Sequence, residues 1–170
     1  MAIDLSTLTE ASTRFRVHVT KAMVEEARTR NAKTVFLCHS HKDEQYVKGF
    51  VQLLNDAGWD AYVDWMDHDM PPRPNRKTAE NIQRRIKQST YFMFLATPNA
   101  MKSRWCPWEI GYADGVKQSD RIFVAATRDG GGIHGNEYLD LYRRVNFSEG
   151  RRLKAWQPGD TEHGVEIASL

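Results

Sequence analysis

The chain has 170 residues, of which 41% are hydrophobic and 27% are charged, and its formal net charge is +2. This length suits one domain with a substantial core, and the balance of apolar and charged residues excludes disordered and membrane-spanning classes. The small net charge gives no indication of nucleic-acid binding. The first residues lack the features of a signal peptide and two cysteines cannot form a disulfide framework, so we expect a cytoplasmic location and no membrane partner.

Residues 1–32 precede the main pattern and carry an apolar stripe at helical spacing. The stripe runs through the segment 8–30 and is formed by Phe15, Val17, Val19, Ala22, Met23 and Ala27. This spacing predicts an added amphipathic helix, which is marginal in water by itself and must therefore pack on another surface. We expect it to pack on the domain's own body, because that arrangement needs no partner.

From residue 33 to residue 148, short apolar runs alternate with helical periodicity. The β-rich runs predict strands at 34–38, 60–65, 91–96, 121–126 and, more weakly, 144–147. Helical stripes predict one helix that starts near 40–43 and stops at Gly58, one that carries Ala79, Ile82 and Ile86, and others at 105–116 and 136–142. The remaining segments are predicted to be a proline-rich loop at 70–75, a flexible glycine loop at 130–132 and a polar, loosely ordered tail at 149–170.

This alternation predicts an α/β fold of the flavodoxin-like, three-layer kind, with a central parallel sheet of about five strands and helices on both faces. In such a sheet, ligands bind beyond the carboxyl ends of the strands, at the point where the strand order reverses. Here those ends lead into the segments 38–43, 65–77 and 97–109. We therefore expect the domain at 33–148 to form its site from these three segments.

The segment 103–109 reads SRWCPWE and is the most informative stretch of the chain. Pro107 suits the first turn of a helix, where a missing N–H is not needed. Glu109 is then expected in that first turn, between large aromatic side chains. There it is either a charge that favours the helix dipole or a working acid group in a shielded environment.

Three segments in chain order resemble motifs of the TIR (Toll/interleukin-1 receptor) domain family of the bacterial and plant type. FLCHSHKD at 36–43 resembles the opening strand and loop, GWDAYVDW at 58–65 resembles the second strand, and SRWCPWE at 103–109 is similar to the Ser-x-Trp-Cys-x-x-Glu helix. The resemblance covers residues 33–147. The N-terminal helix, the glycine run and the weak fifth strand depart from the family pattern, but they lie outside the proposed site.

The resemblance implies an NAD+ glycohydrolase or ADP-ribosyl cyclase in which Glu109 is the catalytic residue and NAD+ is a substrate, so no cofactor is expected. Cleavage of the nicotinamide–ribose bond develops positive charge at the anomeric carbon, and a facing carboxylate stabilises that charge most in the transition state. Nicotinamide is already a good leaving group, so a second acid is not required. The implied substrate-binding residues are His39, Ser40, Trp65, Arg76, Lys77, Ser103 and Trp105, with Trp108 as an alternative aromatic wall.

A local positive patch lies between Arg73 and Lys87, where six basic residues accompany the single acidic residue Glu80. The patch either offers partners for the phosphates of a dinucleotide or is a solvated helix face. The neighbouring 65–77 loop is expected to gate the site or to contact another subunit.

Two further kinds of site are not expected. The segments 39–43 and 67–69 place His and Asp residues at ligand spacing, but the sequence fixes no third or fourth ligand, so we expect no metal. Cys38 and Cys106 have no assured base partner, and we expect both to be small buried hydrophobic residues.

Two classes of function remain open. The first is an NAD+-consuming enzyme of bacterial antiphage defence, of the Thoeris type, which self-associates and passes an ADP-ribose-derived signal to a downstream effector. The second is a non-catalytic TIR interaction module, and a nucleoside deoxyribosyltransferase-like enzyme is a more remote alternative. Glu109 favours the enzyme, and so does the lack of a receptor, coiled-coil or nucleotide-binding segment in this sequence.

Overall fold

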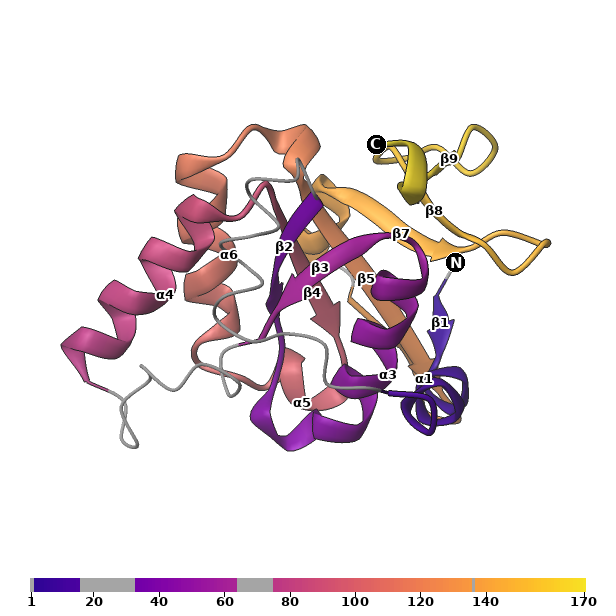
Figure 1. Cartoon of the computed structure of the whole chain (residues 1–170), viewed down its shortest axis with the longest axis horizontal. Helices are drawn as coiled ribbons and strands as arrows, with labels where there is room; N and C mark the ends of the chain where they lie inside the picture. Colours follow the sequence, from indigo (N-terminus) through magenta and orange to yellow (C-terminus); the bar gives the residue numbers. More distant parts are fainter. Residues whose placement is uncertain (1, 16–32, 64–74, 136) are drawn as a thin grey trace.

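Five parallel strands form the centre of the sheet in the computed structural model, which describes residues 2–15, 33–63, 75–135 and 137–170 (Figure 1). They are β2 (Lys33–Cys38), β3 (Trp59–Tyr62), β4 (Tyr91–Ala96), β5 (Ile122–Asp129) and β7 (Arg143–Phe147). Their order in the sheet is β3, β2, β4, β5, β7, which is the order found in flavodoxin-like folds. The predicted fold class is confirmed, and the strand order reverses between β2 and β4.

Helices cover both faces of this sheet. The helices α4 (Arg76–Gln88) and α6 (Cys106–Val116) lie on one side, whereas α1 (Leu5–Ser12) and α3 (Glu44–Asp56) lie together on the other (Figure 1). The shorter helices are η1 (His41–Asp43), α5 (Pro98–Met101), η3 (Ser119–Arg121), η4 (Glu137–Leu141) and η5 (Ile167–Ser169). The described elements therefore form the three layers that the sequence predicts.

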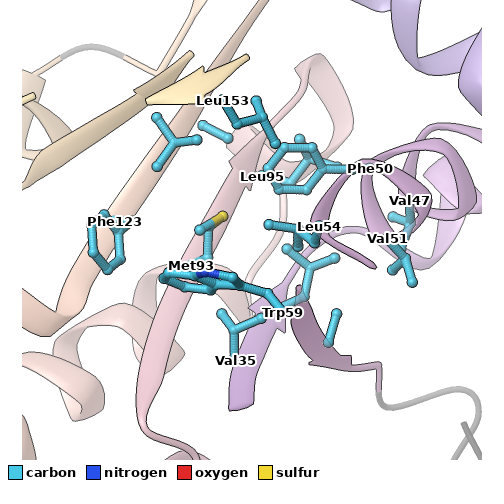
Figure 2. Close-up of a cluster of buried hydrophobic side chains, with 14 of the residues drawn as sticks. Val35, Val47, Phe50, Val51, Leu54, Trp59, Met93, Leu95, Phe123 and Leu153 are labelled. Atoms are coloured by element: carbon cyan, nitrogen blue, oxygen red, sulfur yellow. The ribbon is translucent and has the colours of Figure 1, made fainter. Parts of the chain in front are cut away.

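Alternate residues of the central strands enter two separate cores. In β4, Met93 and Leu95 belong to the core on the α3 side, whereas Phe92 belongs to the core on the α4 and α6 side. Figure 2 shows the first of these cores, in which Leu95 lies near Phe50 of α3 and Leu153 of a C-terminal strand. Because both faces of β4 are buried, its sequence reads as one continuous apolar run.

The N-terminal segment packs on the domain's own body. The strand β1 (Ile3–Asp4) pairs in parallel with β5, and α1 follows it directly. Leu8 of α1 is fully buried, and a Cβ atom placed on Gly49 of α3 would lie only 1.9 Å from the Leu8 carbonyl oxygen. The helix α1 comes before the predicted apolar stripe, whose members beyond Phe15 lie outside the described residues, so the docking of that stripe stays a prediction. A continuous helix over 8–30 is wrong, because α1 ends at Ser12, and residues 16–32 lie outside the described residues.

The C-terminal residues extend the sheet, which corrects the prediction of a loosely ordered tail. The strand β8 (Leu153–Trp156) pairs antiparallel with β7, and β9 (Val165–Glu166) pairs antiparallel with β8. Leu153, Ala155 and Ile167 are buried in the core on the α3 side. The Ile167 carbonyl oxygen also accepts a 2.8 Å hydrogen bond from the indole nitrogen of Trp59. A few apolar residues thus anchor a segment whose overall composition is polar.

The glycine run also differs from its prediction as a flexible loop. The strand β5 continues to Asp129, and β6 (Gly132–His134) returns antiparallel beside it. The Asp129 carboxylate accepts a 2.8 Å hydrogen bond from the Gly131 N–H, and Gly132 has a φ of 133°. A carboxylate and a glycine backbone therefore build a tight hairpin turn here.

Two other predicted elements are shorter than expected. The second strand, predicted at 60–65, is β3 and ends at Tyr62, while the segment 64–74 lies outside the described residues. The helix predicted at 136–142 is the 3₁₀ helix η4, which has five residues. Among the described helices, none combines the length and the apolar character needed to cross a membrane.

Candidate active site

A cavity of about 330 Å³ opens beside the carboxyl ends of β2 and β4, where the strand order reverses. This is the place where open parallel sheets bind ligands. Its described lining consists of Phe36, Leu37, His39, Ser40, His41, Lys42, Thr78, Ile82, Asn99, Lys102, Ser103, Trp105 and Glu109. The structure therefore brings together five of the residues proposed from the sequence, namely His39, Ser40, Ser103, Trp105 and Glu109.

Glu109 lines this cavity from the first turn of α6 and is only 6% exposed. Pro107 occupies the start of the helix as predicted, and the Glu109 N–H donates a 2.9 Å hydrogen bond to the Trp105 carbonyl oxygen. The helix N-terminus carries a partial positive charge that favours an ionised carboxylate. Because little water surrounds the Glu109 carboxyl group, a negative charge on it would be weakly screened inside the cavity.

Two buried thiols lie next to Glu109. Cys38 ends β2 and Cys106 begins α6, and both side chains are inaccessible to solvent. The Cys106 thiol donates a 3.3 Å hydrogen bond to the His39 carbonyl oxygen. Burial raises the pKa of the Cys38 thiol, and its hydrogen bond with Cys106 and the negative charge of Glu109 raise it further. Cys38 is therefore a small buried residue, as predicted.

The loop after β2 brings His39 and Ser40 to the cavity. His39 is buried, with its Nδ1 atom 2.8 Å from the Leu37 carbonyl oxygen, and its ring centroid lies 5.6 Å from that of His41. The Ser40 hydroxyl oxygen accepts a 3.3 Å hydrogen bond from the Lys42 N–H and so caps η1. Both side chains therefore shape this loop as well as line the cavity.

Among the described tryptophans, Trp105 is the one that lines the cavity. Its ring packs edge to face on Trp108, with 5.5 Å between the centroids, and Trp108 stacks on Tyr112 at 6.1 Å. Trp108 is 36% exposed and does not contribute to the cavity lining. Trp105 thus supplies an aromatic wall that the second tryptophan supports from outside, while Trp65 lies outside the described residues.

Ser103 lines the cavity and also shapes the start of α6. Its hydroxyl oxygen accepts hydrogen bonds of 3.1 Å from the Trp105 N–H and 3.3 Å from the Cys106 N–H. These bonds satisfy backbone donors that the helix itself leaves unpaired at its N-terminus. Ser103 therefore helps to orient the turn that carries Trp105 and Glu109.

The cations at the cavity differ from those proposed from the sequence. Arg76 and Lys77 begin α4 but do not line the cavity, and the 90% exposed Arg76 side chain forms an ion pair of 3.0 Å with Glu80. Lys42, from the loop after β2, and Lys102, from the segment after β4, line it instead. Sequence reasoning missed both lysines, although each lies in a segment that was expected to form the site.

Sequence reasoning also missed a buried polar cluster behind the cavity. Asp43 is 3% exposed, and its carboxylate accepts a hydrogen bond from the Thr97 hydroxyl and one of 2.6 Å from the Asn99 amide. Asp43 follows the loop after β2, whereas Thr97 and Asn99 follow β4. In the sequence, Asp43 belongs to a helix start and to a His/Asp segment at metal-ligand spacing, and its tertiary partners carry no signal there.

Among the described residues, no three His, Cys, Asp or Glu side chains gather in a way that would hold a metal ion. In the 39–43 segment, the Asp43 carboxylate is occupied by Thr97 and Asn99. The second candidate segment, 67–69, lies outside the described residues.

The sequence profile of the TIR domain family matches residues 35–155, and the chain belongs to this family. It is 32% identical over 114 residues to a protein of Bacillus cereus (strain MSX-D12) named "Probable 3' cyclic ADP-D-ribose synthase ThsB'", which covers 65% of this chain and 59% of that relative. It is 30% identical over 95 residues to "Putative cyclic ADP-D-ribose synthase TIR2" of Cytobacillus dafuensis, which covers 53% of this chain and 25% of that relative. The chain thus spans less than two thirds of the length of these curated relatives.

Proposed function

We propose that this chain cleaves the nicotinamide–ribose bond of NAD+ and that Glu109 is the catalytic residue. The observation that carries the proposal is the position of Glu109, nearly buried in the first turn of α6 and lining a cavity where the strand order reverses. Both relatives are named as synthases of cyclic ADP-D-ribose, whose ADP-ribose part is also that of NAD+. Those names support the same substrate for this chain.

In the proposed reaction, the bond between the pyridinium nitrogen and C1′ of the ribose breaks. Its electron pair leaves with nicotinamide, which becomes neutral, and positive charge develops at C1′ and the ring oxygen. The Glu109 carboxylate opposes that charge, and it does so more strongly in the transition state than in the ground state. Water, or a nucleophilic atom of the same ADP-ribose unit, then bonds to C1′ and loses a proton. Attack by water gives ADP-ribose, and intramolecular attack gives cyclic ADP-ribose, which contains one water less.

The size of the cavity supports recognition of one half of the dinucleotide. Ligand pockets range from about 300 to 1,000 Å³, so a cavity of about 330 Å³ suits the nicotinamide and its ribose rather than all of NAD+. Trp105 offers a flat apolar surface to the planar base. Lys42 and Lys102 are exposed members of the lining, which suits them to bind the diphosphate that follows.

We place this activity in the cytoplasm, in bacterial antiphage defence of the Thoeris type. The product in this proposal is a cyclic form of ADP-ribose, lighter than ADP-ribose by one water, that a downstream effector senses. The enzyme self-associates through its TIR surfaces. The names of the two relatives favour the cyclic product over free ADP-ribose.

A non-catalytic interaction module is the second candidate function. The observation that favours it is the partly exposed pair of Trp108 and Tyr112 on α6, since such aromatic surfaces occur in protein interfaces. Lys87 of α4 lies over the Tyr112 ring, 5.8 Å from its centroid, and continues this surface. An interaction module of this kind would bind partner proteins without consuming NAD+.

One incubation separates the two candidates. Purified protein is incubated with NAD+ over a range of protein concentrations, nicotinamide is measured by chromatography, and the second product is weighed by mass spectrometry. The enzyme releases nicotinamide together with a product lighter than ADP-ribose by one water. Absence of nicotinamide at every protein concentration, including those that favour self-association, contradicts the enzyme and supports the interaction module.

A further inference from the structure

We propose that Asp43 is a positioning residue that locks together the two loops flanking the cavity and thereby sets the affinity for the dinucleotide. The loop after β2 carries His39, Ser40 and Lys42, and the segment after β4 carries Asn99 and Lys102. Asp43 itself does not line the cavity, so it acts through these neighbours. The inference rests on the proposed function, because it assigns the way in which the same site is held in shape.

The hydrogen bonds of Asp43 join the two loops through both carboxylate oxygens. Oδ2 accepts from the Thr97 hydroxyl, and Oδ1 accepts from the Asn99 amide at 2.6 Å. The Thr97 oxygen also accepts a 3.0 Å hydrogen bond from the Ala100 N–H, which directs the hydroxyl proton toward Asp43. On its own loop, the Asp43 N–H donates a 2.9 Å hydrogen bond to the Ser40 carbonyl oxygen.

Burial makes this arrangement specific. Asp43 is 3% exposed and Thr97 is inaccessible to solvent, so water does not replace a lost partner easily. A buried donor without an acceptor is strongly unfavourable, and the loops must move to satisfy it. Loss of the carboxylate therefore frees the two loops from each other and does not merely remove a charge.

The expected consequence is a change in affinity more than in chemistry. A dinucleotide that contacts both Lys42 and Lys102 must order two independent loops once Asp43 no longer joins them, and this ordering opposes binding. Glu109 lies on α6, in a turn shaped by Ser103, and keeps its own position. We therefore expect KM for NAD+ and the dissociation constant for ADP-ribose to rise, with a much smaller change in kcat.

The test compares Asp43→Ala with Asp43→Asn. Alanine removes both hydrogen bonds, and we expect it to weaken ADP-ribose binding on the order of tenfold. Asparagine accepts from Thr97 through its carbonyl oxygen and donates to Asn99 after that amide flips, so it rebuilds the bridge without the charge. Asp43→Asn should therefore bind ADP-ribose within about threefold of the wild type.

Thr34→Val is the matched control for general destabilisation. The Thr34 hydroxyl oxygen accepts a 3.0 Å hydrogen bond from the Thr90 N–H and joins β2 to the residue before β4. This bond lies at the amino ends of the two strands, whereas the cavity lies at their carboxyl ends. Its removal should lower the melting temperature and leave ADP-ribose binding unchanged. If Asp43→Ala does not fold, Thr97→Val is compared with Thr97→Ser instead. Only serine keeps the hydroxyl group that donates a hydrogen bond to Asp43.

Calorimetric titration with ADP-ribose and steady-state cleavage of NAD+ are both measured for each variant. The proposal is overturned if Asp43→Ala, or Thr97→Val in its place, binds ADP-ribose as tightly as the wild type. It is equally overturned if Asp43→Asn binds as weakly as Asp43→Ala, because the charge and not the bridge would then matter. If the wild type releases no nicotinamide, the proposed function fails, while the ADP-ribose titrations still decide the role of Asp43.

Discussion

Replacing Gly49 by alanine tests the close packing of α1 on α3. A Cβ atom at this position would lie 1.9 Å from the Leu8 carbonyl oxygen, about 1.5 Å short of ordinary van der Waals contact. That oxygen belongs to backbone, so the helix α1 must shift as a unit and lift the buried Leu5 and Leu8. Overpacking of this kind costs about 1–3 kcal/mol, and full exposure of two leucines adds up to about 3–6 kcal/mol. A partial shift of α1 exposes only part of the two leucines, so we expect a loss of about 2–5 kcal/mol in the free energy of unfolding, between overpacking alone and full exposure.

The matched control is Gly111→Ala in α6, where an added Cβ atom meets no other atom within 4 Å. Alanine is favoured over glycine inside a helix by about 1 kcal/mol, so this control should be neutral or stabilising. Thermal and urea unfolding of both variants provide the assay, and for a chain of this size each kcal/mol shifts the melting temperature by about 2–4 °C. Equal stability of Gly49→Ala and Gly111→Ala would refute the reasoning, because α1 would then not approach α3 as described.

Two further predictions concern charge. Lys42→Ala and Lys102→Ala should each raise KM for NAD+ about fivefold, since each removes one exposed cation from the cavity. Arg76→Ala is the control and should change KM less than about twofold. Equal effects of all three variants on KM would contradict the assignment of the cavity cations. Burial, and to a lesser extent Arg121, lowers the pKa of Lys117 from 10.5 to about 8. The folded state therefore binds fewer protons than the unfolded state between about pH 8 and 10.5. For this reason Lys117 makes the free energy of unfolding increase as the pH rises through this range. Lys117→Met should flatten that rise in urea unfolding measured from pH 7 to 10, and an unchanged slope would show that another group is responsible.

The strands β2, β4 and β5 were predictable because both of their faces are buried along most of their length. The run 91–96 consists of aromatic and aliphatic residues, and each of its side chains packs in or against one of the two cores. The place of Glu109 was also predictable, since Pro107 marks the first turn of α6. These features depend on the local sequence, and the structure contains them where they were predicted.

The features that sequence reasoning missed depend on tertiary partners. Nothing next to Gly49 indicates that the backbone of Leu8 lies against it. Asp43 belongs to a helix start in the sequence, but its carboxylate binds residues that follow a different strand. The sequence favoured the basic residues of α4 as phosphate partners because several of them lie close together. In the structure, the described cavity is instead lined by one lysine from each of two loops, Lys42 and Lys102. The strand β8 was not predicted, because Leu153 and Ala155 are separated by a lysine and lie within a polar segment.

The rate of nicotinamide release by Glu109→Gln, compared with the wild type and with Glu80→Gln, tests the central claim most directly. Glutamine keeps the volume of the side chain but removes the charge that opposes the developing cation, whereas Glu80 is exposed and pairs with Arg76 away from the cavity lining. We predict that Glu109→Gln keeps the melting temperature within a few degrees and lowers kcat on the order of a hundredfold or more, while Glu80→Gln stays near the wild-type rate. A folded Glu109→Gln protein that releases nicotinamide at the wild-type rate would contradict the account.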